Sequence, residues 1–293
     1  MTSVALIVPV KNGGPLWRMV IASILAQHLR SQRILVIDSG STDGSDEVAK
    51  AAGFEVHTIA PEHFDHGGTR RMAVEMVPDC RTVVFLTQDA MLDGPNALEQ
   101  LVLVLHAHPR AGVAYGRQLP RAEAGPIERH ARLFNYPEQS TEKSLEDIPR
   151  LGIKTAFTSN SFAAYRREAL LRAGGFPQHC AMGEDMIAAA RILLQGGTVV
   201  YAAQARVIHS HGFTMAEEAR RYYGIGRMHA QQQPLLARFQ SPASEGNRFV
   251  RSELVFLSRH APWRIPEALV RTLSKYIAYR WGKRVNLVME QAG

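Results

Sequence analysis

Acidic side chains that could bind a metal ion or remove a proton occur at three separated places in this sequence. Asp38 and Asp89 each follow a short apolar run, and the pair Glu184-Asp185 opens a segment of helical character. A carboxylate at such a place can bond a nucleotide, hold a divalent cation or take a proton from a hydroxyl group. Ordinary structural roles compete with these, because Asp-Ser-Gly-Ser also forms turns and acidic pairs also compensate helix dipoles.

Two histidines add candidate metal ligands near the end of a further apolar segment. His209 and His211 are alternate residues, so on a strand both side chains would point to the same face. The chain holds 12 histidines, most of which we expect to be structural or exposed. The two cysteines, Cys80 and Cys180, stand far apart and show no metal-binding spacing, which favours a reduced, cytoplasmic protein.

Predicted strands and helices alternate over the first part of the chain. Short apolar runs are typical of strands that are buried on both faces of a parallel sheet. We predict strands at residues 4–8, 33–37, 54–59, 82–87 and 112–117, and helices at 16–27, 45–52, 69–77 and 96–106. This order predicts an α/β fold with a mostly parallel central sheet flanked by helices.

The ends of the predicted strands carry most of the polar candidates. In an open parallel sheet, ligands bind beyond the carboxyl ends of the strands. The first strand runs into Pro9-Val-Lys-Asn12, the second into Asp38, and the fourth into Gln88-Asp89. These ends predict a nucleotide site on one edge of the sheet. The glycine patterns of dinucleotide-binding and P-loop proteins do not follow the first strand, which argues against those classes.

The second part of the chain is less regular until its C-terminal segment. Residues 118–155 are rich in Pro, Glu and Arg and predict a long loop with one short helix near 129–134. Strands are predicted at 161–166 and at 198–209, the latter as one strand or two, and helices at 168–173, at 184–194 and from 215 onward.

The excess of positive charge belongs to the C-terminal segment. Residues 1–215 hold 21 basic and 21 acidic side chains, whereas residues 216–293 hold 13 basic and 6 acidic ones. One predicted helix there combines an apolar face with basic neighbours: Leu269, Leu273, Tyr276, Ile277 and Trp281, beside Arg271, Lys275, Lys283 and Arg284. Such a helix can lie on an anionic membrane surface, or it can pack on the rest of the chain or on a partner subunit.

No leader peptide and no bilayer-spanning apolar stretch is expected from the sequence. The predicted location is therefore the cytoplasm or the inner face of the cell membrane.

Five motifs together carry a family resemblance. They are Pro9-Val-Lys-Asn12, Val36-Ile-Asp38-Ser-Gly-Ser-Thr-Asp43-Gly44, Phe85-Leu-Thr-Gln-Asp89-Ala, Gly174-Gly-Phe176 and Glu184-Asp185. In this order and spacing they resemble family 2 of the glycosyltransferases, which are inverting enzymes with the GT-A fold, over residues 3–215. His66-Gly-Gly-Thr-Arg70, Thr-Gln-Asp89-Ala and His209-Ser-His211 look most like the bacterial rhamnosyltransferase branch, whose usual donor is dTDP-L-rhamnose.

The resemblance implies a site for a nucleotide sugar and a divalent cation. The positions that match its donor-binding residues are Pro9, Val10, Asn12, Asp38, Gly67, Gly68, Arg70 and Gln88. Asp89 matches the second carboxylate of the D-x-D motif that holds Mg²⁺ or Mn²⁺, and Thr87 replaces the first. His209 best matches a metal-binding histidine after the last strand, with His211 close behind.

The resemblance also implies a catalytic base. Asp185 matches the general base that removes the acceptor's proton, and Glu184 would orient it. The catalytic domain would be residues 1–215, with a donor half at about 1–117 and an acceptor half at about 118–215. The basic helical segment 216–293 would follow it.

The predicted activity is inverting transfer of a sugar, by resemblance L-rhamnose, to an acceptor hydroxyl in bacterial surface polysaccharide or glycolipid synthesis. Expected partners are a dTDP- or UDP-sugar, a glycan or lipid-linked acceptor, an anionic membrane surface and a further copy of the chain, but no nucleic acid. Two alternatives stay open. One is a nucleotidyltransferase, and the other is a non-catalytic membrane- or nucleic-acid-binding protein with a degenerate transferase domain.

Overall fold

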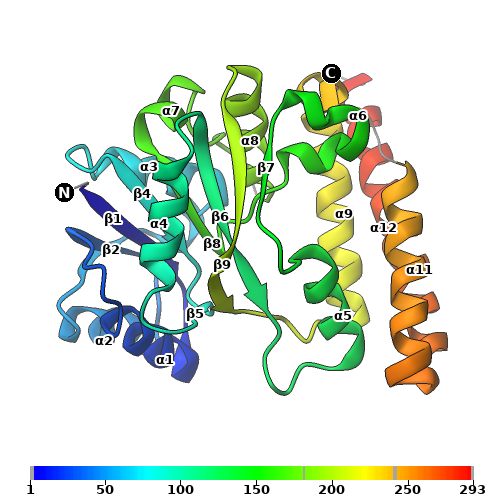
Figure 1. Cartoon of the computed structure of the whole chain (residues 1–293), viewed down its shortest axis with the longest axis horizontal. Coiled ribbons are helices and arrows are strands. Elements are labelled where there is room, and N and C mark those ends of the chain that lie inside the picture. The colour runs from blue at the N-terminus through cyan, green and yellow to red at the C-terminus, as the bar shows by residue number, and fades with distance from the viewer. Residues whose placement is uncertain (1–2, 181, 240–242, 292–293) are drawn as a thin grey trace.

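A nine-stranded sheet forms the centre of the computed structural model, which describes residues 3–180, 182–239 and 243–291 (Figure 1). The sheet order is β3-β2-β1-β4-β8-β6-β9-β5, and β7 pairs with β9 off this path. The strands are β1 Val4–Val10, β2 Arg33–Asp38, β3 Glu55–Thr58, β4 Thr82–Leu86, β5 Met91–Leu92, β6 Ala111–Leu119, β7 Thr141–Lys143, β8 Phe162–Arg166 and β9 Thr198–Ile208.

Six of the nine strands run in the same direction. β1, β2, β3 and β4 are parallel neighbours. The antiparallel strand β8 stands between β4 and β6, so β6 and its parallel partner β9 again point the same way as β4. Only β8, β5 and β7 run in the opposite direction. The mostly parallel sheet is as predicted, and its carboxyl-terminal edge collects the ends of β1, β2, β4, β6 and β9.

Helices cover both faces of this sheet, and each face has its own apolar core. Along β1 the side chains alternate, so Leu6 and Val8 belong to one core whereas Ala5 and Ile7 belong to the other. The first face is covered by α1 Gly14–Leu25, α2 Ser45–Ala51 and α4 Ala97–Ala107. The second is covered by α3 His66–Glu75, α7 Arg167–Arg172 and α8 Glu184–Leu194.

The C-terminal helices stand beside the end of the sheet that carries β9 (Figure 1). The remaining helices are α5 Pro126–Asn135, α6 Ile148–Leu151, α9 Met215–Gln231, α10 Gln233–Leu236, α11 Ala243–His260 and α12 Ile265–Gln291. Short 3-10 helices are η1 Pro61–His63, η2 Leu145–Asp147, η3 Gly152–Ala156, η4 Ala237–Phe239 and η5 Pro262–Arg264. Within the described ranges, no helix is both long and apolar enough to cross a bilayer.

Three sequence-based expectations about local structure are corrected. The predicted loop 118–155 does contain α5, but it also contains β7 and several short helices, and Ser144 caps η2. Helix α3 begins at His66 rather than at residue 69, because the Asp65 side chain caps the amides of its first turn. β9 is a single strand that ends at Ile208, so His209 and His211 follow the strand instead of alternating along it.

Candidate active site

Asp89, His209 and His211 meet where β5 pairs with the end of β9. In this antiparallel pair Met91 lies opposite Ile208, so residues just before β5 and just after β9 become neighbours. His209 Nε2 lies 3.3 Å from Asp89 Oδ1, and His211 Nδ1 lies 3.5 Å from Asp89 Oδ2. One ligand atom from each residue falls within 4.8 Å of the other two. The residue types and their spacing fit a site for a divalent metal ion.

Gln118, at the end of β6, fixes the imidazole of His209. Arg132 donates to Gln118 Oε1 at 2.5 Å, which identifies this atom as the amide oxygen. His209 Nδ1 lies 3.0 Å from the same oxygen, so Nδ1 carries the proton and Nε2 turns its lone pair toward Asp89. A lone pair and a carboxylate oxygen at this distance repel each other unless a cation lies between them. A histidine held through its second nitrogen is the usual arrangement at metal centres.

Burial and charge set the protonation states of this group. Burial lowers the pKa of His209 below its ordinary value, and it lowers the pKa of His211 to about 4. Burial alone would raise the pKa of Asp89, but the nearby side chains of His209 and His211 outweigh burial and lower that pKa. At neutral pH the group therefore offers one carboxylate and two neutral imidazoles, which are the forms that bind metal.

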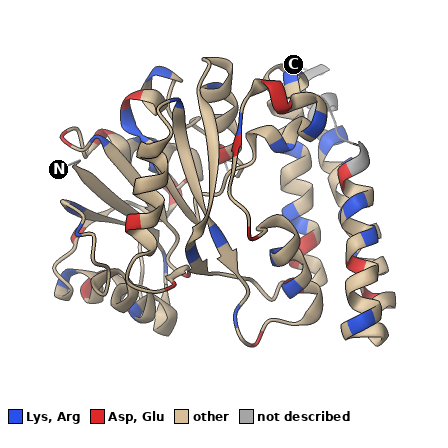
Figure 2. Ribbon diagram, viewed as in Figure 1, with Lys and Arg blue, Asp and Glu red and all other residues tan. Residues whose placement is uncertain are grey.

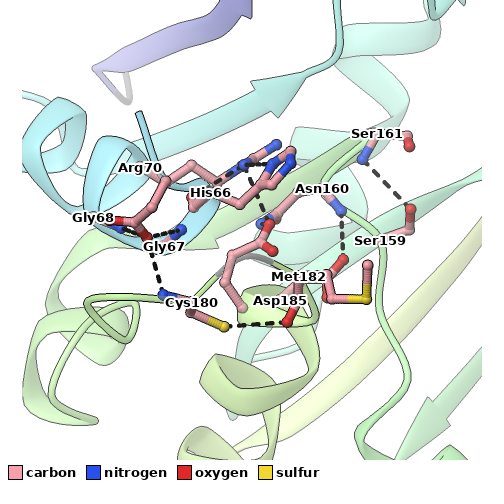
Figure 3. Close-up of polar contacts among 12 residues, drawn as sticks. His66, Gly67, Gly68, Arg70, Ser159, Asn160, Ser161, Cys180, Met182 and Asp185 are labelled. Carbon is pink, nitrogen blue, oxygen red and sulfur yellow. Dashed lines mark hydrogen bonds and ion pairs between the residues drawn. The ribbon is translucent and has the colours of Figure 1, made fainter. Parts of the chain in front are cut away.

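Asp185 lies in the first turn of α8, next to a segment that carries Asn160 (Figure 3). The Asn160 backbone N–H donates to Asp185 Oδ2 at 3.2 Å, and the Met186 N–H donates to Oδ1 at 2.8 Å. Burial, reinforced by the negative charge of Glu184, raises the pKa of Asp185 to about 7. A carboxylate with this pKa can accept a proton near neutral pH and is matched to the task of a general base.

Glu184 does not act as the base, because its side chain is held by a residue of α3. Arg70 Nη1 lies 3.3 Å from Glu184 Oε1, and the Asn160 side-chain amide donates to the same oxygen at 2.9 Å. His66 stands beside Arg70, with its Nδ1 3.1 Å from the guanidinium (Figure 3). Burial alone would raise the pKa of Glu184, but Arg70 and His66 outweigh it and keep that pKa below its ordinary value. Glu184 is therefore an ionised positioning residue.

One segment connects the base to the metal group. The Gln118 amide donates to Ser159 Oγ at 2.9 Å, and Gln118 also holds His209. The next residue after Ser159 is Asn160, which binds both Glu184 and Asp185. The metal group and Asp185 are therefore joined through neighbouring residues on the same edge of the sheet, although they come from distant parts of the sequence.

The predicted donor-binding residues lie at the ends of β1, β2 and β4. Asp38 pairs in register with Val10 and is only 2% exposed. Asp38 Oδ2 accepts the N–H groups of Gly40 and Ser41, while its Oδ1 accepts no hydrogen bond from any described residue. The Gln88 amide bonds the backbone N–H and carbonyl of Lys11, which connects the end of β1 to the residue before Asp89. Asp38, Asp89 and Asp185 therefore lie along the same edge of the sheet, where the parallel strands end.

The other predicted donor residues make protein contacts in this structure. Asn12 has a φ of 47° and its side chain accepts the N–H of Thr42, while Val10 belongs to an apolar core. Pro9 stands one residue before Val10 in β1 and is partly exposed. The N–H groups of Gly67 and Gly68 both donate to Asp65, and a Cβ on Gly67 would lie 1.9 Å from the Pro177 carbonyl. Both amides are thus occupied, and donor binding by these residues stays a prediction.

Comparison with known proteins assigns the family. Residues 5–173 match the model of "Glycosyl transferase family 2". Over 281 residues the chain is 42% identical to the O-antigen chain rhamnosyltransferase RfbN of Salmonella typhimurium, covering 96% of this chain and 89% of that protein. It is also 42% identical to the O-antigen chain rhamnosyltransferase WbaN of Salmonella anatum, covering 97% and 90%. The chain belongs to glycosyltransferase family 2.

Solved structures agree with this assignment at the level of fold. The mannosyltransferase PcManGT of Pyrobaculum calidifontis, in complex with GDP-Man and Mn²⁺, superposes with a TM-score of 0.61 at 20% identity, covering 97% of this chain and 84% of that one. S. aureus TarS 1-349 in complex with UDP-GlcNAc gives 0.58 at 15% identity, covering 97% and 91%. The GT-A fold expected from the motifs is therefore confirmed, and family membership favours sugar transfer over both alternatives.

Three supporting residues of this family 2 glycosyltransferase were given no role in the sequence analysis. Gln118, Asn160 and His66 support the metal group, the base and the Arg70–Glu184 pair. Gln118 stands one residue past a strand predicted to end at residue 117, and polar residues at strand ends are a usable signal. Asn160 stands in Thr-Ser-Asn-Ser, which reads as an ordinary turn. His66 precedes two glycines, which obscured the start of α3.

Proposed function

We propose that this glycosyltransferase moves L-rhamnose from dTDP-L-rhamnose to an acceptor hydroxyl in the synthesis of a bacterial surface polysaccharide or glycolipid. The two relatives with 42% identity over almost the whole chain, both named for transfer to the O-antigen chain, support this sugar and this process. Solved proteins of the same fold hold GDP-Man or UDP-GlcNAc, which supports a nucleotide-sugar donor.

The observation that carries the proposed mechanism is the position of Asp185. Its carboxylate has a pKa raised to about 7 and is held by Asn160, which follows the serine bonded to Gln118. Gln118 in turn holds His209 of the metal group. A base and a group that can bind a cation on one edge of the sheet are suited to sugar transfer from a diphosphate.

The proposed reaction inverts the anomeric carbon in one displacement. Asp185 takes the proton of the acceptor hydroxyl as the acceptor oxygen bonds to the anomeric carbon of the sugar. The bond between that carbon and the diphosphate oxygen breaks, and its electron pair leaves with the nucleoside diphosphate. Only one base is needed, on the side of the sugar opposite the leaving group.

The metal group would support departure of the diphosphate. A divalent ion bound there supplies Lewis-acid stabilisation of the charge on the leaving diphosphate. Asp89, His209 and His211 are the residues that would hold it. Two imidazoles beside a single carboxylate favour Mn²⁺ over Mg²⁺, because Mg²⁺ prefers oxygen ligands.

On the donor side, the base and ribose would lie against the ends of β1 and β2. We assign Asp38 Oδ1, which accepts no hydrogen bond from the described residues, as the acceptor for the nucleobase. Residues 1–117 would form the donor half and residues 118–215 the acceptor half. The C-terminal helices would follow as a separate segment.

A donor panel tests this function. Purified protein with Mn²⁺ is offered dTDP-, UDP- and GDP-sugars, and the release of nucleoside diphosphate and the transfer of sugar are measured. We expect dTDP-L-rhamnose to be preferred. Asp89→Asn should abolish Mn²⁺-dependent release, whereas Asp93→Asn, four residues away and paired with Arg206, should retain it. Preference for another nucleotide sugar would contradict the donor assignment, and unchanged activity of Asp89→Asn would contradict the metal role.

A further inference from the structure

Six large apolar side chains in the described part of α12 point away from the protein, whereas small residues of the same helix point inward. The exposed fractions of the large ones lie between 49% and 64%: Leu269, Val270, Leu273, Tyr276, Ile277 and Trp281. Toward the protein, Ala268 and Ala278 are buried. A Cβ on Gly282 would lie 2.1 Å from the Tyr223 carbonyl in α9. This is the reverse of an ordinary surface helix, which buries its large apolar side chains.

The exposed charges of the described parts of α11 and α12 have one sign. In the described parts of α11 and α12, every exposed charged side chain is basic: Arg248, Arg251, Arg259, Arg280, Lys283 and Arg284. The acidic side chains described in these helices are not exposed to solvent in the same way. Glu253 is buried, and Glu245 and Glu267 are partly buried in ion pairs. Figure 2 shows basic residues along α11, with acidic ones between them.

Two basic residues that the sequence placed beside the apolar face turn inward instead. Arg271 pairs with Glu218 of α9 at 2.8 Å, and Lys275 lies 3.9 Å from the same carboxylate. They therefore join α12 to α9 and leave Arg280, Lys283 and Arg284 as the exposed cations of the helix. Arg271 and Lys275 are therefore not part of the exposed basic face that the sequence predicted. The charged residues that remain on that face are still positive.

We infer that the exposed face of α12 rests on an anionic membrane surface. The face is a stripe along α12 from Leu269 to Trp281, about 18 Å long at the helical rise, and the exposed Trp263 stands in η5 just before this helix. Tryptophan and tyrosine at the edge of an apolar stripe, with basic residues beside it, fit the boundary between headgroups and acyl chains. A second copy of the chain fits less well, because its face would bring like charges together.

The same helix is fastened to the segment that follows the metal-group histidines. Arg271 donates to the Phe213 carbonyl at 3.0 Å, and the Phe213 ring stacks on His211 with centroids 4.8 Å apart. A membrane contact through α12 would thus hold the acceptor side of the site close to lipid. The use of a lipid-linked acceptor rests on the proposed function, whereas the membrane contact of α12 does not depend on that function.

Vesicle flotation with the full chain tests the contact and needs no activity. We expect the protein to float with vesicles of phosphatidylcholine mixed with phosphatidylglycerol, less with phosphatidylcholine alone, and less as salt rises. Leu273→Ser/Ile277→Ser should abolish flotation. Met19→Ser/Leu103→Ser, which alters equally exposed apolar residues on α1 and α4, should not. Arg280→Gln/Arg284→Gln should weaken binding roughly 30-fold, and Arg18→Gln/Arg172→Gln should leave it unchanged.

Three results would overturn the inference. The first is no flotation with anionic vesicles, and the second is equal loss in the α12 and control variants. The third is a dimer in solution that Leu273→Ser/Ile277→Ser dissociates, which would assign the face to a second copy. Assays of sugar transfer distinguish failure of the membrane contact from failure of the proposed function. The α12 variant should keep transfer to a soluble acceptor and lose only transfer to a vesicle-borne one, whereas failure of the proposed function would remove both.

Discussion

Arg70 and Glu184 form an ion pair of 3.3 Å whose side chains are 4% and 6% exposed. The pair joins α3 to the first turn of α8 and places an ionised carboxylate directly before Asp185. Because that negative charge helps to raise the pKa of Asp185, the pair connects the stability of the site with its acid–base chemistry.

Breaking this pair should cost stability. Arg70→Met leaves Glu184 buried without its cation, and we expect the free energy of unfolding to fall by about 3–5 kcal/mol in urea titration. Arg71→Met is the matched control, because Arg71 pairs with Glu75 at the surface, where an exposed pair contributes about 1 kcal/mol or less. Equal losses for the two variants would show that the buried pair has no special role.

Removing the charge of Glu184 should move the pH dependence of transfer. Asp185 must be ionised to act as the base, so kcat/KM should rise with pH through its pKa of about 7. Glu184→Gln removes a neighbouring negative charge, which lowers the pKa of Asp185 and shifts this acidic limb to lower pH. The profile is measured on the folded fraction of each variant. A limb that stays in place or moves upward would contradict the proposed coupling.

Gln118 should control metal affinity without touching the ion. Gln118→Leu removes the oxygen that holds His209 Nδ1, and we expect Mn²⁺ affinity, measured by electron paramagnetic resonance, to fall about 10- to 100-fold. Gln27→Leu alters another buried and hydrogen-bonded glutamine, on the connection after α1, whose side chain bonds Ser23, Gly94 and Leu98 and none of the metal-group residues. It should leave Mn²⁺ affinity unchanged even where it lowers stability. An unaltered affinity in Gln118→Leu would contradict the positioning role.

Gly67 should be required for packing of α3 against the loop before α8. Gly67→Ala places a methyl group against the Pro177 carbonyl, and we expect a loss of about 1–3 kcal/mol in unfolding free energy. Gly246→Ala in α11 meets no atom within 4 Å and should be neutral or stabilising by up to about 1 kcal/mol. Thermal and urea unfolding of both variants measure the difference.

Much of the fold was predictable because its strands are continuous apolar runs. β1, β2 and β4 occur where the sequence placed them, and polar residues follow each of them. β5 has two residues and β7 three, so neither is long enough to show a period. Both depend on pairing with β9, which is distant in the sequence. The local sequence pattern could not predict β5 and β7, because these strands form only through their contacts with β9.

The site was predictable in its acids and histidines but less so in their supports. Asp89 and His209 are chemically conspicuous, and family motifs mark them. The contact between them depends on the pairing of β5 with β9, which no local signal gives. Asn160 bonds both Glu184 and Asp185 from a turn of small polar residues. Its role is set by geometry that only the folded chain provides.

The role of Asp185 is tested most directly by the turnover of Asp185→Asn with saturating donor and Mn²⁺, measured beside the donor dissociation constant. The amide keeps the size of the carboxylate but cannot take the acceptor's proton. We predict that kcat falls by a factor of about 10²–10⁴ while the donor dissociation constant changes only a few-fold. Turnover at the wild-type rate would show that the base lies elsewhere, and simultaneous loss of donor binding would show that Asp185 is structural.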